Sequence, residues 1–150
     1  MEQTGFKNLE IALQSYAESV GTQYKDVLNA KNYRIAESVK WEVKTMGSVY
    51  IVVLNLEEYW KWIENGRKPG KMPPPDSLIS WIKSKGIQPK KGIAVKSLAF
   101  LIARKIGRVG IKPKHLLTDV LNRQGSFKKK ITDAFKADIK DAAKSITLKD

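Results

Sequence analysis

The chain has 150 residues, of which 42% are hydrophobic and 29% are charged, values typical of a folded protein. A chain of this length buries roughly two-thirds of its unfolded surface, and we expect one domain over residues 1–150. Because cysteine is absent, disulfides, thiolate catalysis and Cys-ligated zinc are excluded. The longest apolar run, residues 49–54, is too short to cross a bilayer, and the N-terminus lacks the layout of a signal peptide. These features predict a protein of a cytosol-like compartment without a membrane partner.

The net charge of +13 is concentrated in one part of the chain. Residues 1–65 carry 7 basic and 9 acidic residues, and residues 132–150 carry 4 of each. Residues 66–91 carry 7 basic residues and 1 acidic residue, and residues 92–131 carry 10 and 1. Such a segment attracts polyanions, nucleic acid first and acidic protein surfaces second. The alternative is a lysine-rich surface that only water contacts.

Residues 6–30 are expected to form one amphipathic helix. Apolar residues recur there at spacings of three and four, which places them on a single face. A face this continuous needs a sheet or another helix against it. Its residues are Phe6, Leu9, Leu13, Tyr16, Ala17, Val20, Tyr24, Val27 and Leu28.

Residues 38–54 are expected to form a β-hairpin. The period of the pattern changes to two at Ser38, Gly47-Ser48 provides a tight turn, and residues 49–54 make a β-branched second strand. Two strands alone are marginal in water, so the hairpin must pack on helices or pair with further strands. Because the second strand is apolar on both faces, we expect both faces to be covered, with a neighbouring subunit as a candidate for one cover.

The segment that follows has two possible structures. Acidic residues at its front and Asn-Gly at its end fit a short helix over 57–66 with Gly66 in the left-handed cap. The alternation of residues 59–64 fits a short strand equally well, and the sequence leaves this open. Residues 67–75 contain four prolines and one glycine, which predicts an extended, partly polyproline loop.

The rest of the chain reads as helices. Asp76 is expected to cap a helix that Gly86 ends, and another helix is expected over 93–109. A short helix over 115–122 precedes a long final helix over 126–146, capped by Ser126. The predicted fold class is α+β, with an N-terminal helix, a small antiparallel sheet (hairpin 38–54) packed by several helices, and a long C-terminal helix 126–146 that is a candidate extension of the domain. The apolar stripes are Leu78, Trp81 and Ile82; Val95, Leu98, Ala99, Ile102 and Ile106; and Phe127, Ile131, Ala134, Phe135, Ile139, Ala142 and Ile146.

No residue pattern indicates catalysis. His115 is the only histidine, so a His-rich metal site and a paired-His mechanism are both excluded, and we assign it a structural role at a helix start. No serine has the glycines of a nucleophile elbow, and no glycine spacing fits a phosphate-binding or dinucleotide-binding loop. We therefore predict that the chain is not an enzyme and has no catalytic, cofactor-binding or metal-binding residues and no small-molecule substrate.

The richest constellation lies between Tyr59 and Trp81, where aromatic residues bracket a stiff cationic loop. Aromatics between cations can stack on bases and hold phosphates. The structural alternative, which we favour, is that the tryptophans pack under the prolines and anchor the loop. A rigid, anchored loop is also a good protein-docking element because little entropy is lost on binding. This candidate docking loop comprises Tyr59, Trp60, Trp62, Arg67, Lys68, Lys71, Met72 and Trp81.

Two stretches resemble a known family. Residues 59–74 read Tyr-Trp-Lys-Trp-Ile-Glu-Asn-Gly-Arg-Lys-Pro-Gly-Lys-Met-Pro-Pro, and residues 78–87 read Leu-Ile-Ser-Trp-Ile-Lys-Ser-Lys-Gly-Ile. This order resembles the tail-completion or minor tail proteins of tailed bacteriophages, which have an aromatic segment, a Met-Pro-Pro loop and a tryptophan-bearing helix ending in Lys-Gly. The apolar helix around residues 98–106 and the Gly-x-x-Pro of residues 110–113 also resemble that family. The chain departs from it at Lys114-His115, where the family usually has an aromatic residue.

The resemblance implies a role without chemistry. Such proteins form a closed ring in the neck of the virion, around the channel through which DNA leaves, and contact the portal or adaptor protein and the tail proteins. We therefore expect a homo-oligomeric ring at the virion head–tail joint, assembled in the cytoplasm of the host bacterium, with non-specific DNA contact. The alternative is a basic nucleic-acid-binding protein that acts as a monomer. The residues expected to face DNA or an acidic partner are Arg67, Lys68, Lys71, Lys90, Lys91, Arg104, Arg108, Lys112 and Lys114.

Overall fold

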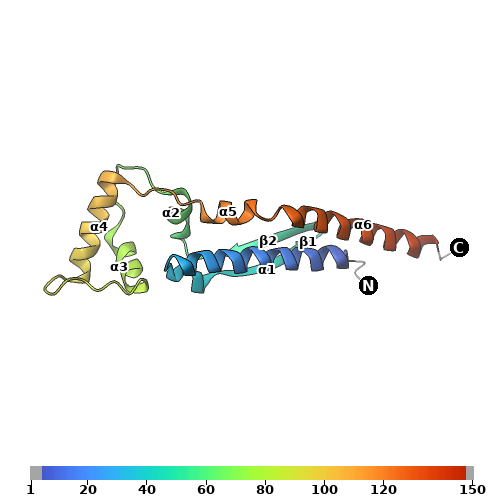
Figure 1. The fold of residues 1–150 in the computed structure, drawn as a ribbon, viewed down its shortest axis with the longest axis horizontal. Helices are drawn as coiled ribbons and strands as arrows, with labels where there is room; N and C mark the ends of the chain where they lie inside the picture. The colour runs from blue at the N-terminus through green and yellow to red at the C-terminus, as the bar shows by residue number, and fades with distance from the viewer. Residues whose placement is uncertain (1–4, 148–150) are drawn as a thin grey trace.

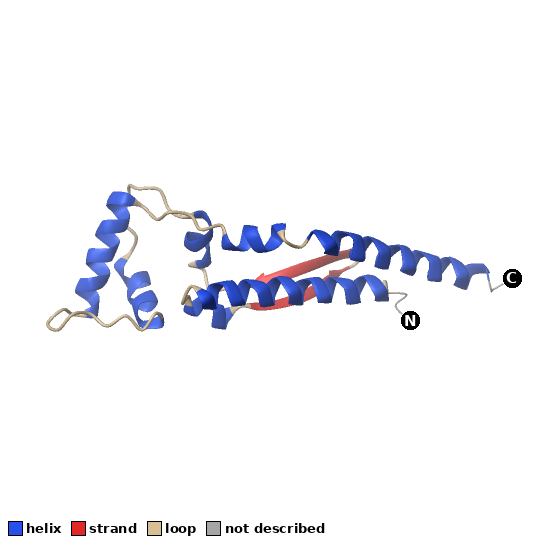
Figure 2. Ribbon diagram, in the orientation of Figure 1, coloured by secondary structure: helices blue, strands red, loops and turns tan. Residues whose placement is uncertain are grey.

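Six α-helices and one β-hairpin form in residues 5–147, which are the residues that the computed structural model describes (Figures 1 and 2). The predicted α+β class is confirmed, with a helix at the start, one antiparallel hairpin and a long helix at the end. No helix among these residues is long and apolar enough to cross a membrane. In chain order the elements are α1 (Lys7–Ala30), the 3-10 helix η1 (Arg34–Ser38), β1 (Lys40–Met46), β2 (Val49–Asn55), α2 (Trp60–Asn65), α3 (Pro75–Ser84), α4 (Val95–Val109), α5 (Leu116–Asn122) and α6 (Gly125–Thr147).

The molecule is elongated and has two parts (Figure 1). The body, residues 5–65 and 115–147, contains α1, the hairpin, α2, α5 and α6, and it holds both described ends of the chain at one tip. The arm, residues 66–114, contains α3 and α4 and lies at the opposite end. Buried apolar residues gather in two clusters, one within the body and one between α3 and α4.

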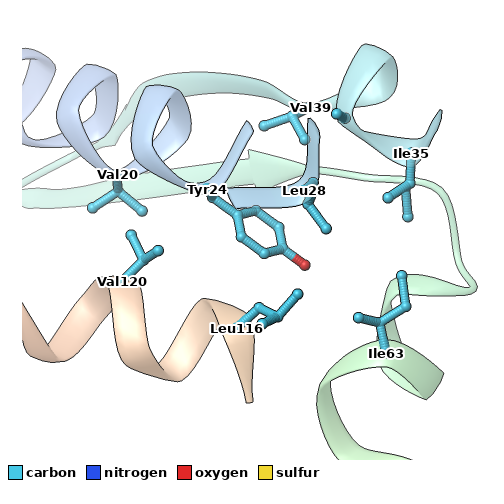
Figure 3. Packing of buried hydrophobic residues seen from close by; sticks show 9 residues of the cluster. Val20, Tyr24, Leu28, Ile35, Val39, Ile63, Leu116 and Val120 are labelled. Carbon is cyan, nitrogen blue, oxygen red and sulfur yellow. The ribbon is translucent and has the colours of Figure 1, made fainter. Parts of the chain in front are cut away.

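The core of the body forms on the predicted apolar face of α1. Tyr24 and Leu28 are fully buried and pack with residues of η1, α2 and α5 (Figure 3). On the neighbouring side of α1, Gly21 makes room for the Trp41 ring of β1, because a β-carbon at Gly21 would lie 2.1 Å from Trp41 Cε3. The buried residues of this cluster are Val20, Tyr24, Leu28, Ile35, Ala36, Val39, Ile63, Leu116 and Val120.

The hairpin covers α1 with one face and leaves the other face open. The register pairs Trp41 with Leu54 on the inner face and Met46 with Val49 on the outer face. On that outer face Val49 is 55% exposed and Ile51 is 38% exposed. Among the residues that the structure describes, no second layer lies over the outer face, so the expected second cover of β2 is not found within them.

The long helix α6 packs antiparallel to α1 and then extends beyond it (Figure 1). Its first half is held by contacts such as the edge-on packing of Phe127 on Tyr16, with ring centroids 5.6 Å apart. Farther along the helix, Ile139 and Ile146 of the predicted stripe are exposed, and Ile146 is 73% exposed. The apolar stripe of α6 is therefore covered by α1 along its first half and is exposed to solvent beyond it.

In the arm, α3 packs against α4, and each helix contributes its predicted apolar face. Leu78, Ile82, Ala99 and Ala103 are buried between them. The helix α3 ends in a Schellman motif, in which Ile87 N donates to the carbonyl oxygen of Ile82 at 3.1 Å while Gly86 has a φ of +64°.

Three predicted helix caps differ from the structure. Asp76 lies in the first turn of α3, which begins at Pro75, because proline at the first helical position already supplies the required φ. Ser126 lies inside α6, which begins at Gly125 directly after α5, so the predicted interruption is only a short turn. Gly66 has the expected positive φ, +64°, but its ψ is −164°, so it turns the chain into an extended segment rather than a left-handed cap.

Candidate docking interface

The arm is joined to the body by two extended segments that pair with each other. Arg67 N donates to the carbonyl oxygen of Ile111 at 2.8 Å, and Ile111 N donates to that of Arg67 at 2.7 Å. A further bond joins Gly70 N to the carbonyl oxygen of Gly107 at 2.8 Å. The loop that the prolines keep extended thus satisfies its backbone groups against the segment that leaves α4.

Two glycines allow this close pairing. Gly66 and Gly110 both have positive φ, +64° and +71°. A β-carbon at Gly66 would lie 2.3 Å from the carbonyl oxygen of Ile111, and one at Gly110 would lie 2.2 Å from that of Arg67. Backbone oxygens cannot move away as a flexible side chain can, so both positions require glycine.

The short helix α2 distributes the aromatic residues of the predicted docking loop between the two cores. Tyr59 and Trp60 pack against the core of the body, whereas Trp62 packs against the core of the arm. Trp81 of α3 also packs in the arm core, and Pro73 is fully buried. Aromatic residues before and after the loop thus pack against the two cores, and their predicted packing under the prolines stays a prediction.

Arg67 is part of this anchoring rather than a free surface cation. Its guanidinium carbon lies 5.5 Å from the centroid of the Trp62 ring, and its Nη2 donates to the carbonyl oxygen of Lys71 at 3.0 Å. The side chains of Lys68, Lys71 and Met72 are exposed. The exposed positive charge of the loop therefore comes from Lys68 and Lys71, while Arg67 holds the loop against Trp62.

Glu64 connects α2 to α5 and is only 5% exposed. Its Oε2 accepts from Leu117 N at 2.8 Å, and its Oε1 accepts from Thr118 N at 2.9 Å and from Thr118 Oγ1 at 2.6 Å. Burial alone would raise the pKa of Glu64, but the hydrogen bonds from Thr118 and Leu117, with a contribution from His115, lower it below its ordinary value. Glu64 is thus an N-terminal cap that another element supplies to α5.

Tyr24 lies in the core of the body, where the negative charge of Glu64 affects its pKa. Burial raises the pKa of Tyr24 to about 12, and the charge of Glu64 contributes to the shift. The tyrosine is fully buried, and its hydroxyl has no hydrogen-bond partner among the described residues. A phenol held neutral in this way is a packing residue and not an acid–base group at ordinary pH.

Lys85, at the end of α3, makes a second contact between the arm and the body. Its ammonium group donates to the carbonyl oxygen of Asn32 and lies 3.8 Å from the centroid of the Tyr33 ring. Burial lowers the pKa of Lys85. Asn32 has a φ of +58° because it closes the C-terminal turn of α1, where Tyr33 N donates to the carbonyl oxygen of Leu28 at 2.9 Å.

An apolar pocket of about 270 Å³ lies at the junction of arm and body. It is the place where the two cores face each other without filling the space between them. We call it the junction pocket. It is lined by Tyr33, Tyr59, Trp62, Ile63, Leu78, Trp81, Ile102, Ile106, Ile111, Lys112 and Lys114.

The residues predicted to face DNA or an acidic partner lie in several segments of the arm: the proline loop, the loop before α4, α4 itself and the segment after it. Arg104 and Arg108 lie on the exposed face of α4, and Lys90 and Lys91 lie in the loop before it. Among the described residues the only ion pair is Lys44–Glu42, at 3.2 Å, within the hairpin. Within the described residues, the cations of the arm therefore form no ion pair.

Sequence reasoning missed two functional candidates on α4. Phe100 and Leu101 are 48% and 51% exposed, on the side of the helix away from its buried stripe. Their position off the stripe was the available signal, because a helix that packs with one face does not need large apolar residues on the other. Together with Arg104 and Arg108 they give α4 an outward face that is both apolar and cationic.

No group of three or more His, Cys, Asp or Glu side chains within residues 5–147 is arranged to hold a metal ion. His115 has a φ of +51° and precedes α5, where its backbone N donates to the carbonyl oxygen of Glu64 at 3.2 Å. It lies in the connection between α2 and α5, and the structural role of its side chain stays a prediction. Comparison with protein-family models, with curated protein sequences and with solved structures finds no match for the chain.

Proposed function

We propose that the chain is a structural subunit of the neck of a tailed bacteriophage. In this proposal it forms a homo-oligomeric ring at the joint between head and tail, around the DNA channel, and has no catalytic activity. Its neighbours are the portal or adaptor protein and the tail proteins, and it assembles into the virion in the host cytoplasm. The proposal starts from the sequence resemblance of residues 59–87, which form the junction of arm and body.

The observation that carries the proposal is that one elongated subunit has different apolar faces that no described residue covers. The outer face of the hairpin exposes Val49 and Ile51, and α4 at the other end exposes Phe100 and Leu101. A ring needs heterologous contacts, in which one face of a subunit meets a different face of the next. Exposed apolar patches on a folded protein commonly mark such contact sites.

The charge of the arm supports contact with the DNA that passes through a neck. Residues 66–114 contain one acidic residue, Asp76, among many lysines and arginines. Lysine and arginine side chains contact phosphates without reading sequence, which suits a channel through which the whole genome moves. The same cations suit an acidic neighbouring ring, so the proposal assigns the arm to the polyanionic side of the assembly.

Deletion of the gene in the phage that encodes the chain tests this function. The expected result is filled heads and free tails that do not join, seen by negative-stain electron microscopy, with joining restored when purified protein is added. Rings of the purified or particle-bound protein are expected by native mass spectrometry. Normal tailed particles from the deletion strain would overturn the proposal.

A second candidate is a monomeric nucleic-acid-binding protein, favoured by the exposed cations of the arm, which form no ion pair among the described residues. It predicts that the isolated monomer binds duplex DNA with an affinity that falls steeply as salt rises. Fluorescence anisotropy with a labelled duplex over a salt series, combined with sedimentation of the same samples, separates the two functions. A monomer that binds DNA tightly and never assembles favours this second candidate.

A further inference from the structure

The junction pocket combines an apolar interior with a positively charged edge. Aromatic and aliphatic side chains from both cores line its interior, and Lys112 and Lys114 stand at its edge with exposed side chains. None of the lining residues is acidic. The nearby carboxylate of Glu64 accepts hydrogen bonds from the N-terminus of α5 and is not among the lining residues.

The size of the pocket limits what it can hold. Small-molecule sites usually measure about 300 to 1,000 Å³, whereas this pocket measures about 270 Å³. A dry apolar cavity of about 150 Å³ is enough to bind benzene in another protein. The volume thus fits one bulky apolar side chain, which is how a protein partner inserts an anchor residue.

We propose that the junction pocket receives a single bulky apolar side chain carried by an acidic segment of a partner protein. Charge complementarity selects this occupant, because the pocket edge and the arm around it are cationic and the single acid of the arm, Asp76, does not line the pocket. The inference rests on the proposed function, in which the partner is a neighbouring protein of the neck.

An occupant of the pocket also bridges the arm and the body. The lining residues come from the body (Tyr33, Ile63) and from the arm (Leu78, Ile106), so an inserted side chain contacts both cores at once. Without it, the arm is already held by the two paired segments, by the packing of Trp62 on the arm core and by Lys85. Partner binding is therefore expected to add one more contact that bridges arm and body.

The test uses the full chain labelled with nitrogen-15 and three short peptides as probes. The first peptide is acetyl-Glu-Asp-Phe-Glu-Asp-amide, the second has alanine in place of phenylalanine, and the third has lysine in place of each acid. The first is expected to shift the indole N–H resonances of Trp62 and Trp81 in a saturable way and to leave Trp41 unchanged. The other two are expected to bind at least about tenfold more weakly, because each lacks one of the two attractions.

Matched variants locate the binding. Ile102→Phe fills the pocket and is expected to weaken the first peptide at least about tenfold, whereas Leu101→Phe adds the same bulk on the exposed side of α4 and has little effect. Lys112→Glu with Lys114→Glu weakens binding, whereas Lys90→Glu with Lys91→Glu leaves it nearly unchanged at moderate salt. The charge variants change exposed side chains only, so they report on the pocket even if Ile102→Phe perturbs folding.

Three results overturn the inference. The first is that the alanine peptide binds as tightly as the phenylalanine peptide. The second is that the phenylalanine peptide binds Ile102→Phe as tightly as Leu101→Phe. The third is that the phenylalanine peptide does not bind at millimolar concentration. A fourth probe, 2-naphthoate, distinguishes the source of the ligand, because its binding without that of the peptide assigns the pocket to a small anion and overturns the protein partner. If the first peptide does not bind while the deletion strain still gives unjoined heads and tails, the inference is wrong and the proposed function is supported. If the peptide binds and the deletion strain forms normal particles, the proposed function falls instead.

Discussion

Asp138 of α6 caps the N-terminus of α1 through residue Asn8, 130 positions earlier in the chain. Its Oδ1 accepts from Asn8 N at 3.0 Å and from Asn8 Nδ2 at 2.8 Å, and its Oδ2 accepts from Leu9 N at 2.7 Å. The residue before α1, Phe6, makes no side-chain cap of its own. The start of α1 therefore depends on the packing of α6, just as the start of α5 depends on Glu64.

The first prediction concerns this cap. Asp138→Ala leaves the first N–H groups of α1 without their acceptor and is expected to lower the free energy of unfolding by about 0.5–2 kcal/mol, the usual value of an N-terminal cap. Asp141→Ala, an exposed residue on the same helix, is the control and is expected to change it by less than about 0.5 kcal/mol. Urea denaturation followed by circular dichroism measures both. Equal effects of the two substitutions would contradict the assignment of Asp138 as a cap.

The second prediction concerns acid stability. Burial alone would raise the pKa of both Glu64 and Asp138, but hydrogen bonds from backbone and side-chain donors lower each pKa below its ordinary value of 4.5 or 3.8. A lowered pKa in the folded state means that each carboxylate stabilises the fold fully above the ordinary value. That contribution is lost as the pH falls through the lowered pKa.

Stability is therefore expected to be flat with respect to these two groups above about pH 5 and to fall below about pH 4. The substitutions Glu64→Gln and Asp138→Asn each lower stability at neutral pH and make the decline in acid shallower. The urea midpoint of each variant over a pH series measures this. A decline as steep as that of the unsubstituted protein in both variants would assign acid sensitivity to other groups.

The third prediction separates two reasons for a glycine. Gly66 and Gly86 have the same φ, +64°, but only Gly66 has a backbone oxygen where a β-carbon would lie. Gly86→Ala is expected to cost about 1–2 kcal/mol for the left-handed conformation alone. Gly66→Ala is expected to cost about 1–3 kcal/mol more, because it displaces the Ile111 carbonyl and because φ +64° with ψ −164° is a backbone conformation that essentially only glycine adopts. Chemical denaturation of the two variants gives the difference, and equal losses would show that the two connecting segments separate easily.

The fourth prediction concerns the exposed lysines of the proline loop. Lys68→Glu with Lys71→Glu is expected to reduce particle assembly or genome retention, because the arm then repels phosphates or an acidic neighbour. The monomer stays folded, since neither lysine side chain is buried. Arg67 is left unchanged because its contact with the Trp62 ring holds the loop.

The control for these lysines makes the same charge change on the body, with Lys31→Glu and Lys40→Glu. Both of these positions are exposed and lie in the part of the chain without excess positive charge. Particle counts and packaged DNA are measured for both double variants in complementation of the deletion strain. Unchanged yield and genome content in the loop variant would remove the loop from the proposed interface.

The sequence alone determined the extents of the long elements. The three-and-four spacing of residues 6–30 and the alternation after Ser38 predict α1 and the hairpin because both patterns are local and sustained. The proline loop was equally predictable, since proline fixes its own φ and lacks an N–H group. The aromatic and cationic residues of the candidate interface were found in the same way, by their density along the chain.

Only the tertiary structure decided how these parts meet. Residues 59–64 fitted a helix or a strand equally, and the helix formed because it sends Trp60 into one core and Trp62 into the other. The carboxylate caps join residues 53 to 130 positions apart, and no local pattern reports on such pairs. The junction pocket exists because two separately packed cores meet without interlocking, which depends on shape and not on composition.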